Sequence, residues 1–180
     1  MFPASPPRPR RSHGVTLLEL LTVTVIVAVI CALGLPALGT TLSRLRADSV
    51  RMQMATAFNL ARSTAITRSR PVAVCPSADG RTCGADWSHG WLIHYDHGAP
   101  VPHPDANDIL RFQSGSTAPD IRAVVSAGRP RLRYQRDGRS GGSTLTVNIC
   151  ANNALHSQVI VNNVGRTRAR RTTEPSPCPH

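Results

Sequence analysis

Two apolar patterns dominate the first third of the chain, and both predict helix. Residues 15–38 are almost uniformly apolar, with Glu19 as their only charged residue. This stretch exceeds the roughly 20 residues that a helix needs to cross a bilayer. Farther along, apolar residues recur every three or four positions, which predicts an amphipathic helix with one face for docking. These positions are Ala47, Val50, Met54, Phe58, Ala61 and Ala65. The polar positions between them are Asp48, Gln53, Thr56, Asn59 and Ser63.

Proline and glycine mark the expected limits of this long helix. Gly34, Pro36 and Gly39 should bend or loosen it near the membrane exit. Pro71 should end it, because the residue before a proline is pushed out of the helical region.

Beyond Pro71 the pattern changes to short runs that predict strands, separated by turn residues. The predicted strands are residues 72–75, 90–95, 109–113, 121–125, 131–136, 144–150 and 158–162. Asp137-Gly138 and Gly141-Gly142 predict a hairpin turn region. We therefore expect an α+β fold. Its long N-terminal helix, membrane-spanning in the first half, packs on a globular domain with an antiparallel β-sheet.

Cysteine usage indicates an oxidising compartment. Cys31 lies in the predicted membrane segment, where a small hydrophobic residue is expected. Spacing pairs Cys75 with Cys83 and Cys150 with Cys178, although four cysteines allow three connectivities. Such bridges fit a periplasm or a cell surface. Zinc binding is the competing reading, but neither a CxxC nor a CxxH spacing is present.

Positive charge is concentrated in the C-terminal third. The chain has 21 basic residues, all of them arginine. Between residues 121 and 171 they face one acid, Asp137. The arginines there are Arg122, Arg129, Arg131, Arg133, Arg136, Arg139, Arg166, Arg168, Arg170 and Arg171. A one-sided basic surface points to an anionic partner such as nucleic acid, and the guanidinium fork suits phosphate. An arginine bias also reflects genome composition in some chains.

Gly14, the apolar Val15 and Glu19 follow a basic leader. This N-terminal motif resembles the class III signal of type IV prepilins. A carboxylate at membrane depth is costly unless it is paired. The resemblance implies that a prepilin peptidase cuts after Gly14 and methylates the new N-terminus at Val15. It also implies that Glu19 pairs with the terminal amine of a neighbouring subunit during assembly. Pilins of this family usually begin with phenylalanine, so Val15 departs from the pattern.

Two simpler readings of this segment stay open. One is a plain transmembrane anchor. The other is a secretory signal cleaved near residues 37–39, although Glu19 fits the core of such a signal poorly. Arg8, Arg10 and Arg11 precede the apolar run, so the leader should stay in the cytoplasm and the rest should face outward.

The last predicted strand is followed by a GRxR motif, which lies between two cysteines. This C-terminal sequence resembles the end of FimT-type minor pilins of the GspH/FimT family. The resemblance implies a flexible segment that binds double-stranded DNA during natural transformation. The residues assigned to DNA binding are Gly165, Arg166, Arg168, Arg170 and Arg171, of which the last two lie beyond the motif.

The spacing of these arginines supports the same hypothesis on physical grounds. Arg166, Arg168 and Arg170 alternate, so in an extended segment they would project on one side toward successive phosphates. Nothing in the sequence suggests base reading, so binding should be sequence-independent and sensitive to salt. A solvated basic tail without a specific role is the competing reading.

A second basic group precedes the motif. In a strand, Arg131 and Arg133 share one face and Arg136 lies on the other. These arginines either widen the DNA-binding surface or simply lie on a solvent-facing strand. The solvent-facing strand is the favoured interpretation.

Metal and enzyme functions find little support. The histidines considered for a metal site are His89, His94, His97 and His103, and they lack a tight ligand pattern. Trp87 and Trp91 are interpreted as core residues rather than base-stacking platforms. Ser140 and Ser143 do not form a GxSxG elbow. No cofactor and no catalytic activity are expected.

The two resemblances together imply a minor pilin with a cleaved leader. The expected parts are the leader at 1–14, the membrane and assembly helix at 15–38, its amphipathic continuation at 39–70, a β-rich GspH/FimT-like domain at 71–171 and a tail at 172–180 tethered by Cys178. The expected partners are double-stranded DNA, other major and minor pilins, prepilin peptidase and the inner membrane before assembly. The expected location is the inner membrane with a periplasmic domain, then the pilus or cell surface. The alternative is a structural minor pilin or a GspH-like pseudopilin of type II secretion, without DNA binding.

Overall fold

The computed structural model describes residues 14–98, 103–126, 131–141, 144–174 and 176–179, without the side chains of residues 36 and 37. The expected leader before Gly14, Arg129, Gly142 and Ser143 lie outside these residues. The chain forms two compact units, residues 1–40 and 41–180.

Helix α1 (Leu17–Thr67) begins at a side-chain cap. The Thr16 hydroxyl oxygen accepts a hydrogen bond from the amide of Glu19 at 3.2 Å, as a helix N-cap does. The first part of α1 is long and apolar enough to cross a membrane, by length and composition. The helix is continuous through residues 34–39, so the glycines and Pro36 do not interrupt it.

The C-terminal half of α1 buries the predicted stripe. All six apolar positions are at most 7% exposed, and Ala57 joins them. The helix ends before Pro71 in a left-handed C-cap. Ser69 has φ 49°, and the amides of Arg70 and Ser69 donate to the carbonyls of Ala65 and Ile66, both at 3.2 Å. This pattern satisfies carbonyls that the end of a helix leaves without partners.

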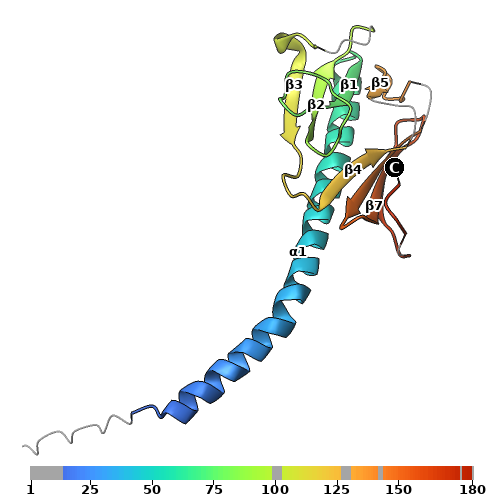
Figure 1. The fold of residues 1–180 in the computed structure, drawn as a ribbon. Helices are drawn as coiled ribbons and strands as arrows, with labels where there is room; N and C mark the ends of the chain where they lie inside the picture. Colours follow the sequence, from blue (N-terminus) through green and yellow to red (C-terminus); the bar gives the residue numbers. More distant parts are fainter. Residues whose placement is uncertain (1–13, 99–102, 127–130, 142–143, 175, 180) are drawn as a thin grey trace, which may run out of the picture. The chain divides into compact units, whose positions relative to one another are not determined.

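Within the described residues, eight strands form two antiparallel sheets, which confirms the expected antiparallel β domain (Figure 1). The first sheet has the order β3-β2-β1-β5. Its strands are β1 (Val72–Pro76), β2 (Gly90–Tyr95), β3 (Ile109–Ser114) and β5 (Leu132–Tyr134), with the short 3-10 helix η1 (Ala106–Asp108) before β3. The second sheet has the order β4-β6-β7-β8. Its strands are β4 (Ile121–Val125), β6 (Leu145–Ala151), β7 (Ala154–Val161) and β8 (Thr167–Arg171).

The turns explain where the strands differ from the predicted ranges. Strand β5 ends early because the amide of Gln135 donates to the carbonyl of Arg139 and begins a tight turn. Strand β7 begins earlier than predicted because β6 and β7 form a hairpin. Its two-residue turn is Asn152-Asn153, with φ of 51° and 64°, as a type I′ turn requires. Strand β8 was not predicted as a strand.

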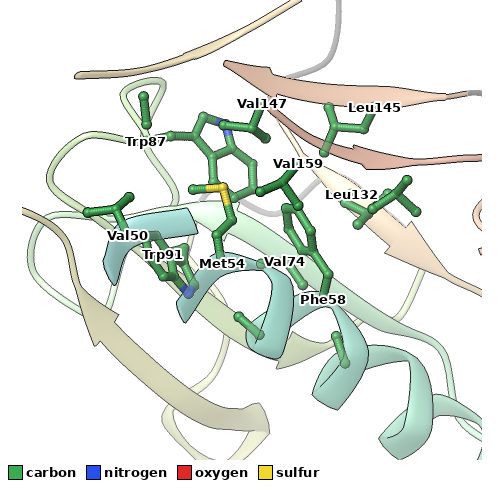
Figure 2. Close-up of a cluster of buried hydrophobic side chains, with 14 of the residues drawn as sticks. Val50, Met54, Phe58, Val74, Trp87, Trp91, Leu132, Leu145, Val147 and Val159 are labelled. Atoms are coloured by element: carbon green, nitrogen blue, oxygen red, sulfur yellow. The ribbon is translucent and has the colours of Figure 1, made fainter. Parts of the chain in front are cut away.

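The core lies between the C-terminal half of α1 and the inner faces of both sheets (Figure 2). Met54 and Phe58 of α1 contribute its largest helical side chains. The ring of Phe58 meets that of Trp87 edge to face, with centroids 5.9 Å apart. Trp87 and Trp91 are both at most 1% exposed, so they are core residues, as interpreted from the sequence.

Two disulfides lie in the described part of the β domain. Cys75 bonds Cys83, and Cys150 bonds Cys178, which are the two pairings that spacing suggested. The tail also pairs with the start of β7, because the amide of Leu155 donates to the carbonyl of Ser176 at 2.9 Å. Cys31 is a free, exposed thiol.

Candidate nucleic-acid interface

The predicted DNA-binding segment is a structured hairpin rather than a loose tail. After β7 the chain turns at residues 162–165, where the amide of Gly165 donates to the carbonyl of Asn162 at 2.8 Å. The side-chain oxygen of Asn162 accepts a hydrogen bond from the amide of Arg166 at 2.8 Å. Gly165 has φ 79°, so the turn resembles the three-residue hairpin loop with a glycine in the left-handed region. The segment that follows returns along β7 as the edge strand β8.

Gly165 also allows two turns to approach closely. A Cβ at this position would lie 1.9 Å from the carbonyl oxygen of Gly138. That oxygen accepts a hydrogen bond from Arg62 Nε at 3.1 Å. Glycine is therefore required here by backbone packing, whatever the segment binds. The contact brings Arg139 and Arg166, which follow the two glycines, to the same end of the domain.

One face of β8 contacts strand β5 and helix α1. Burial raises the pKa of Tyr134 to about 12, and the Thr167 hydroxyl beside it acts in the opposite direction. At the other end of β8, Arg171 Nε donates to Asp48 Oδ1 at 2.9 Å, and its terminal nitrogen contacts Asp48 Oδ2. The hydrogen bond from Arg171 lowers the pKa of Asp48. Arg171, one of the residues predicted to bind DNA, therefore pairs with Asp48 of helix α1.

The outer face of β8 presents the remaining arginines. Arg168 and Arg170 lie opposite Ile160 and Gln158 of β7 and share one face of the sheet. Arg170 donates to Gln158 Oε1 through Nε at 3.0 Å and through a terminal nitrogen at 2.7 Å. Glutamine is neutral, so Arg170 keeps its full charge. Arg166 and Arg168 are exposed and have no side-chain partner among the residues that the structure describes.

The second basic group does not form one surface. Arg133 Nε lies 2.6 Å from Asp96 Oδ2, and the Asp96 side chain is fully buried. This ion pair joins β5 to the segment after β2 and neutralises Arg133. Arg131 is half-buried and Arg136 is exposed.

Three of the four histidines considered for a metal site have different partners within the described residues, and His103 is exposed. His89 contacts Asp86 at 3.0 Å, and His97 contacts Asp108 at 2.7 Å. His94 is fully buried instead, and its neighbours are the two sulfurs of the Cys75–Cys83 disulfide, which no local spacing in the sequence reveals.

The predicted processing residues lie at the start of the described chain. Gly14 and Val15 precede α1, and Glu19 lies in its first turn, exposed. A carboxylate in the first turn interacts favourably with the helix dipole. This local role is compatible with the assembly role expected for Glu19 and independent of it.

Comparison with known proteins identifies the family. The family model described as type II transport protein GspH matches residues 51–165, which is more than half of the chain. The matched region ends at Gly165, so β8 and its arginines lie beyond it. A search of the curated proteins found no match.

Similar solved structures support the fold. Two crystal structures of the type IV minor pilin FimU of Pseudomonas aeruginosa align with TM-scores of 0.59 and 0.56 and identities of 20% and 19%. They cover 74% and 72% of this chain and 94% and 96% of theirs. The minor pseudopilin EpsH of the Vibrio cholerae type 2 secretion system aligns at 0.47 and 12% identity, covering 72% of this chain and 99% of its own. The chain belongs to the GspH family and has the fold of a type IV minor pilin.

Proposed function

We propose that this GspH-family protein is a minor pilin that holds double-stranded DNA on strand β8 for uptake in natural transformation. The observation that carries the proposal is the set of exposed, uncompensated arginines on one hairpin. Arg166 and Arg168 have no side-chain partner among the described residues, and the partner of Arg170 is neutral. The described residues 144–173 include no acidic side chain, and the next residue, Glu174, lies in the tail after β8.

The hairpin suits a phosphate backbone better than a flexible tail does. Arg168 and Arg170 are two residues apart in a strand, so their Cα atoms are separated by about 6.6 Å on one face. The strand is already ordered by β7, by the Asp48–Arg171 ion pair and by the Cys150–Cys178 disulfide, which anchors the tail that follows it. Ordering before binding lowers the entropy lost on association. Contacts of this kind position DNA without reading its sequence.

The N-terminal part supports an assembly role in the same proposal. Prepilin peptidase cuts after Gly14 and Val15 becomes the methylated N-terminus. Helix α1 then anchors the protein in the inner membrane by its apolar half, with the β domain in the periplasm. Glu19 pairs with the terminal amine of a neighbouring pilin, which draws the helix into the filament, and the β domain is displayed at the pilus surface.

A structural pseudopilin is the second candidate function. The description of the matching family model, a type II transport protein, favours it. Charged side chains on an exposed edge strand also discourage edge-to-edge pairing between copies, which gives the β8 arginines a role without DNA. This alternative predicts a defect in secretion or filament assembly and no DNA binding.

A mobility-shift titration distinguishes the two. The compact unit Thr41–His180 contains the whole core and both disulfides and is the fragment to use with random duplex DNA. We expect binding that the Arg166→Ala/Arg168→Ala variant loses. Arg68→Ala/Arg81→Ala is the matched control, because it removes the same charge from exposed positions elsewhere. Equal binding by both variants, or none by the wild type, would favour the pseudopilin.

A further inference from the structure

Three chemically reactive side chains meet on the first sheet, away from β8. Cys75 belongs to β1, His94 belongs to β2, and Cys83 lies in the connection between these strands. Their sulfur and nitrogen ligand atoms all lie within 4.8 Å of one another. Because His94 pairs with Ala73, two residues from Cys75, both side chains project from the same face of the sheet. That face is opposite the one that carries Val72 and Val74 into the main core.

The hydrogen bond of His94 fixes the direction of its free lone pair. Nδ1 lies 2.7 Å from the carbonyl oxygen of Tyr95. A carbonyl accepts hydrogen bonds only, so Nδ1 carries the proton and Nε2 is the acceptor in the neutral ring. Nε2 faces Cys83 Sγ at 3.8 Å. In the disulfide this sulfur has no proton to donate, so a fully buried acceptor is left facing a poor partner.

The same arrangement is favourable once the sulfurs are thiolates and a metal ion lies between them and Nε2. A histidine that donates one ring nitrogen to a carbonyl and presents the other to a metal is the usual form of a metal-ligating histidine. Tetrahedral zinc has Zn–S bonds of about 2.3 Å and Zn–N bonds of about 2.0 Å, which place sulfur and nitrogen about 3.6 Å apart. The Cys83–His94 separation of 3.8 Å is already close to this value.

We infer that Cys75, Cys83 and His94 form a Cys2His zinc site in the reduced chain, with water as the fourth ligand. Each thiol loses its proton on binding Zn²⁺, so two protons are released. The sulfurs must separate to about 3.8 Å, and Cys83 can supply this movement because it lies in a partly exposed loop, whereas Cys75 is held in β1. The soft sulfur donors favour zinc over calcium or magnesium. Metal binding and the disulfide exclude each other, so the site exists only before the disulfide closes.

Cobalt substitution tests the site by spectroscopy. The full-length chain with Cys31→Ala is placed in detergent micelles, reduced with a phosphine, freed of reductant without oxygen and titrated with Co²⁺. We expect thiolate-to-cobalt absorption and tetrahedral d–d bands that saturate at one metal per chain and are displaced by Zn²⁺. His94→Gln should weaken binding at least ~tenfold. His89→Gln is the matched control, because His89 is an exposed histidine before β2.

A second variant separates this site from the other cysteine pair. Cys150→Ser/Cys178→Ser should keep the cobalt spectrum, and the oxidised chain should show none. If reduction loosens the domain, zinc should restore its near-UV circular dichroism, since metal binding adds to folding free energy. The proposal is overturned by a reduced chain without thiolate-to-cobalt absorption, by absorption that follows Cys150 and Cys178, or by a loosened domain that zinc does not restore.

Discussion

The salt dependence of DNA binding measures how many β8 arginines are available to phosphates. Each phosphate neutralised contributes about −0.9 to the slope of log K against log salt. The structure leaves Arg166, Arg168 and Arg170 available and commits Arg171 to Asp48. Three contacts give a slope of about −2.7, which is a loss of about 40-fold in affinity between 50 and 200 mM salt. Four contacts would give about −3.6 and a loss of about 150-fold.

Three single variants make this count testable in the Thr41–His180 fragment. Arg168→Ala should bring the slope to about −1.8, because one contact is lost. Arg171→Ala should leave the slope nearly unchanged, since this guanidinium is already held in an ion pair by Asp48, which also pairs with Arg51. Asp48→Asn should steepen the slope by up to about 0.9, because it frees Arg171 for a phosphate. The assay is fluorescence anisotropy with a labelled random duplex from 50 to 200 mM salt. Equal losses of slope in Arg168→Ala and Arg171→Ala would refute the reasoning.

Three further predictions concern the stability of the domain. Gly165→Ala should destabilise it by ~2–4 kcal/mol in urea unfolding, because φ is 79° and the new Cβ would meet the Gly138 carbonyl. Phe58→Ala should cost ~3–5 kcal/mol in the same assay, because it opens a cavity beside Trp87. Tyr134 has a pKa raised to about 12, so its protonated form is favoured in the fold. The contribution of this phenol to the free energy of unfolding is complete below pH 10 and falls as pH rises, by about 1.4 kcal/mol at pH 11. Tyr134→Phe should lack this loss.

Controls for these variants come from the same regions. Gly141→Ala places its Cβ no closer than 3.6 Å to a neighbour and should change stability little. Gly165→Ala with unaltered stability would contradict the close packing of the two turns. A wild type and a Tyr134→Phe variant that lose stability equally between pH 8 and 11 would contradict the assigned burial of the hydroxyl.

Local periodicity explains how much of the fold was predictable. The stripe on α1 is a repeat of three and four residues, and all its members are buried. Most strands were predictable because each is an apolar run between turn residues. The division into two sheets was not predictable, because it depends on which strands pair over long sequence distances. Strand β8 was missed because its sequence TRARR is strongly charged and lacks an apolar run. Its strand conformation comes from pairing with β7 and from the ion pair between Arg171 and Asp48.

The candidate sites show the same limit. The alternation of Arg166, Arg168 and Arg170 is visible in the sequence and indicated an exposed basic segment. The ion pair that makes Arg171 unavailable to DNA joins residues 123 positions apart, so no local pattern reveals it. His94 meets Cys83 only because the register of β1 and β2 and the path of their connection place them together.

Chemical-shift mapping tests the central claim most directly, because it locates the DNA on the molecule. The ¹⁵N-labelled Thr41–His180 fragment is titrated with a short random duplex at low salt. Binding on β8 predicts shifts concentrated in the amides of residues 162–171 and the guanidinium Nε–H groups of Arg166, Arg168 and Arg170, with little change along β3 of the other sheet. Shifts centred elsewhere, or none at saturating DNA, would contradict a DNA-binding role for β8.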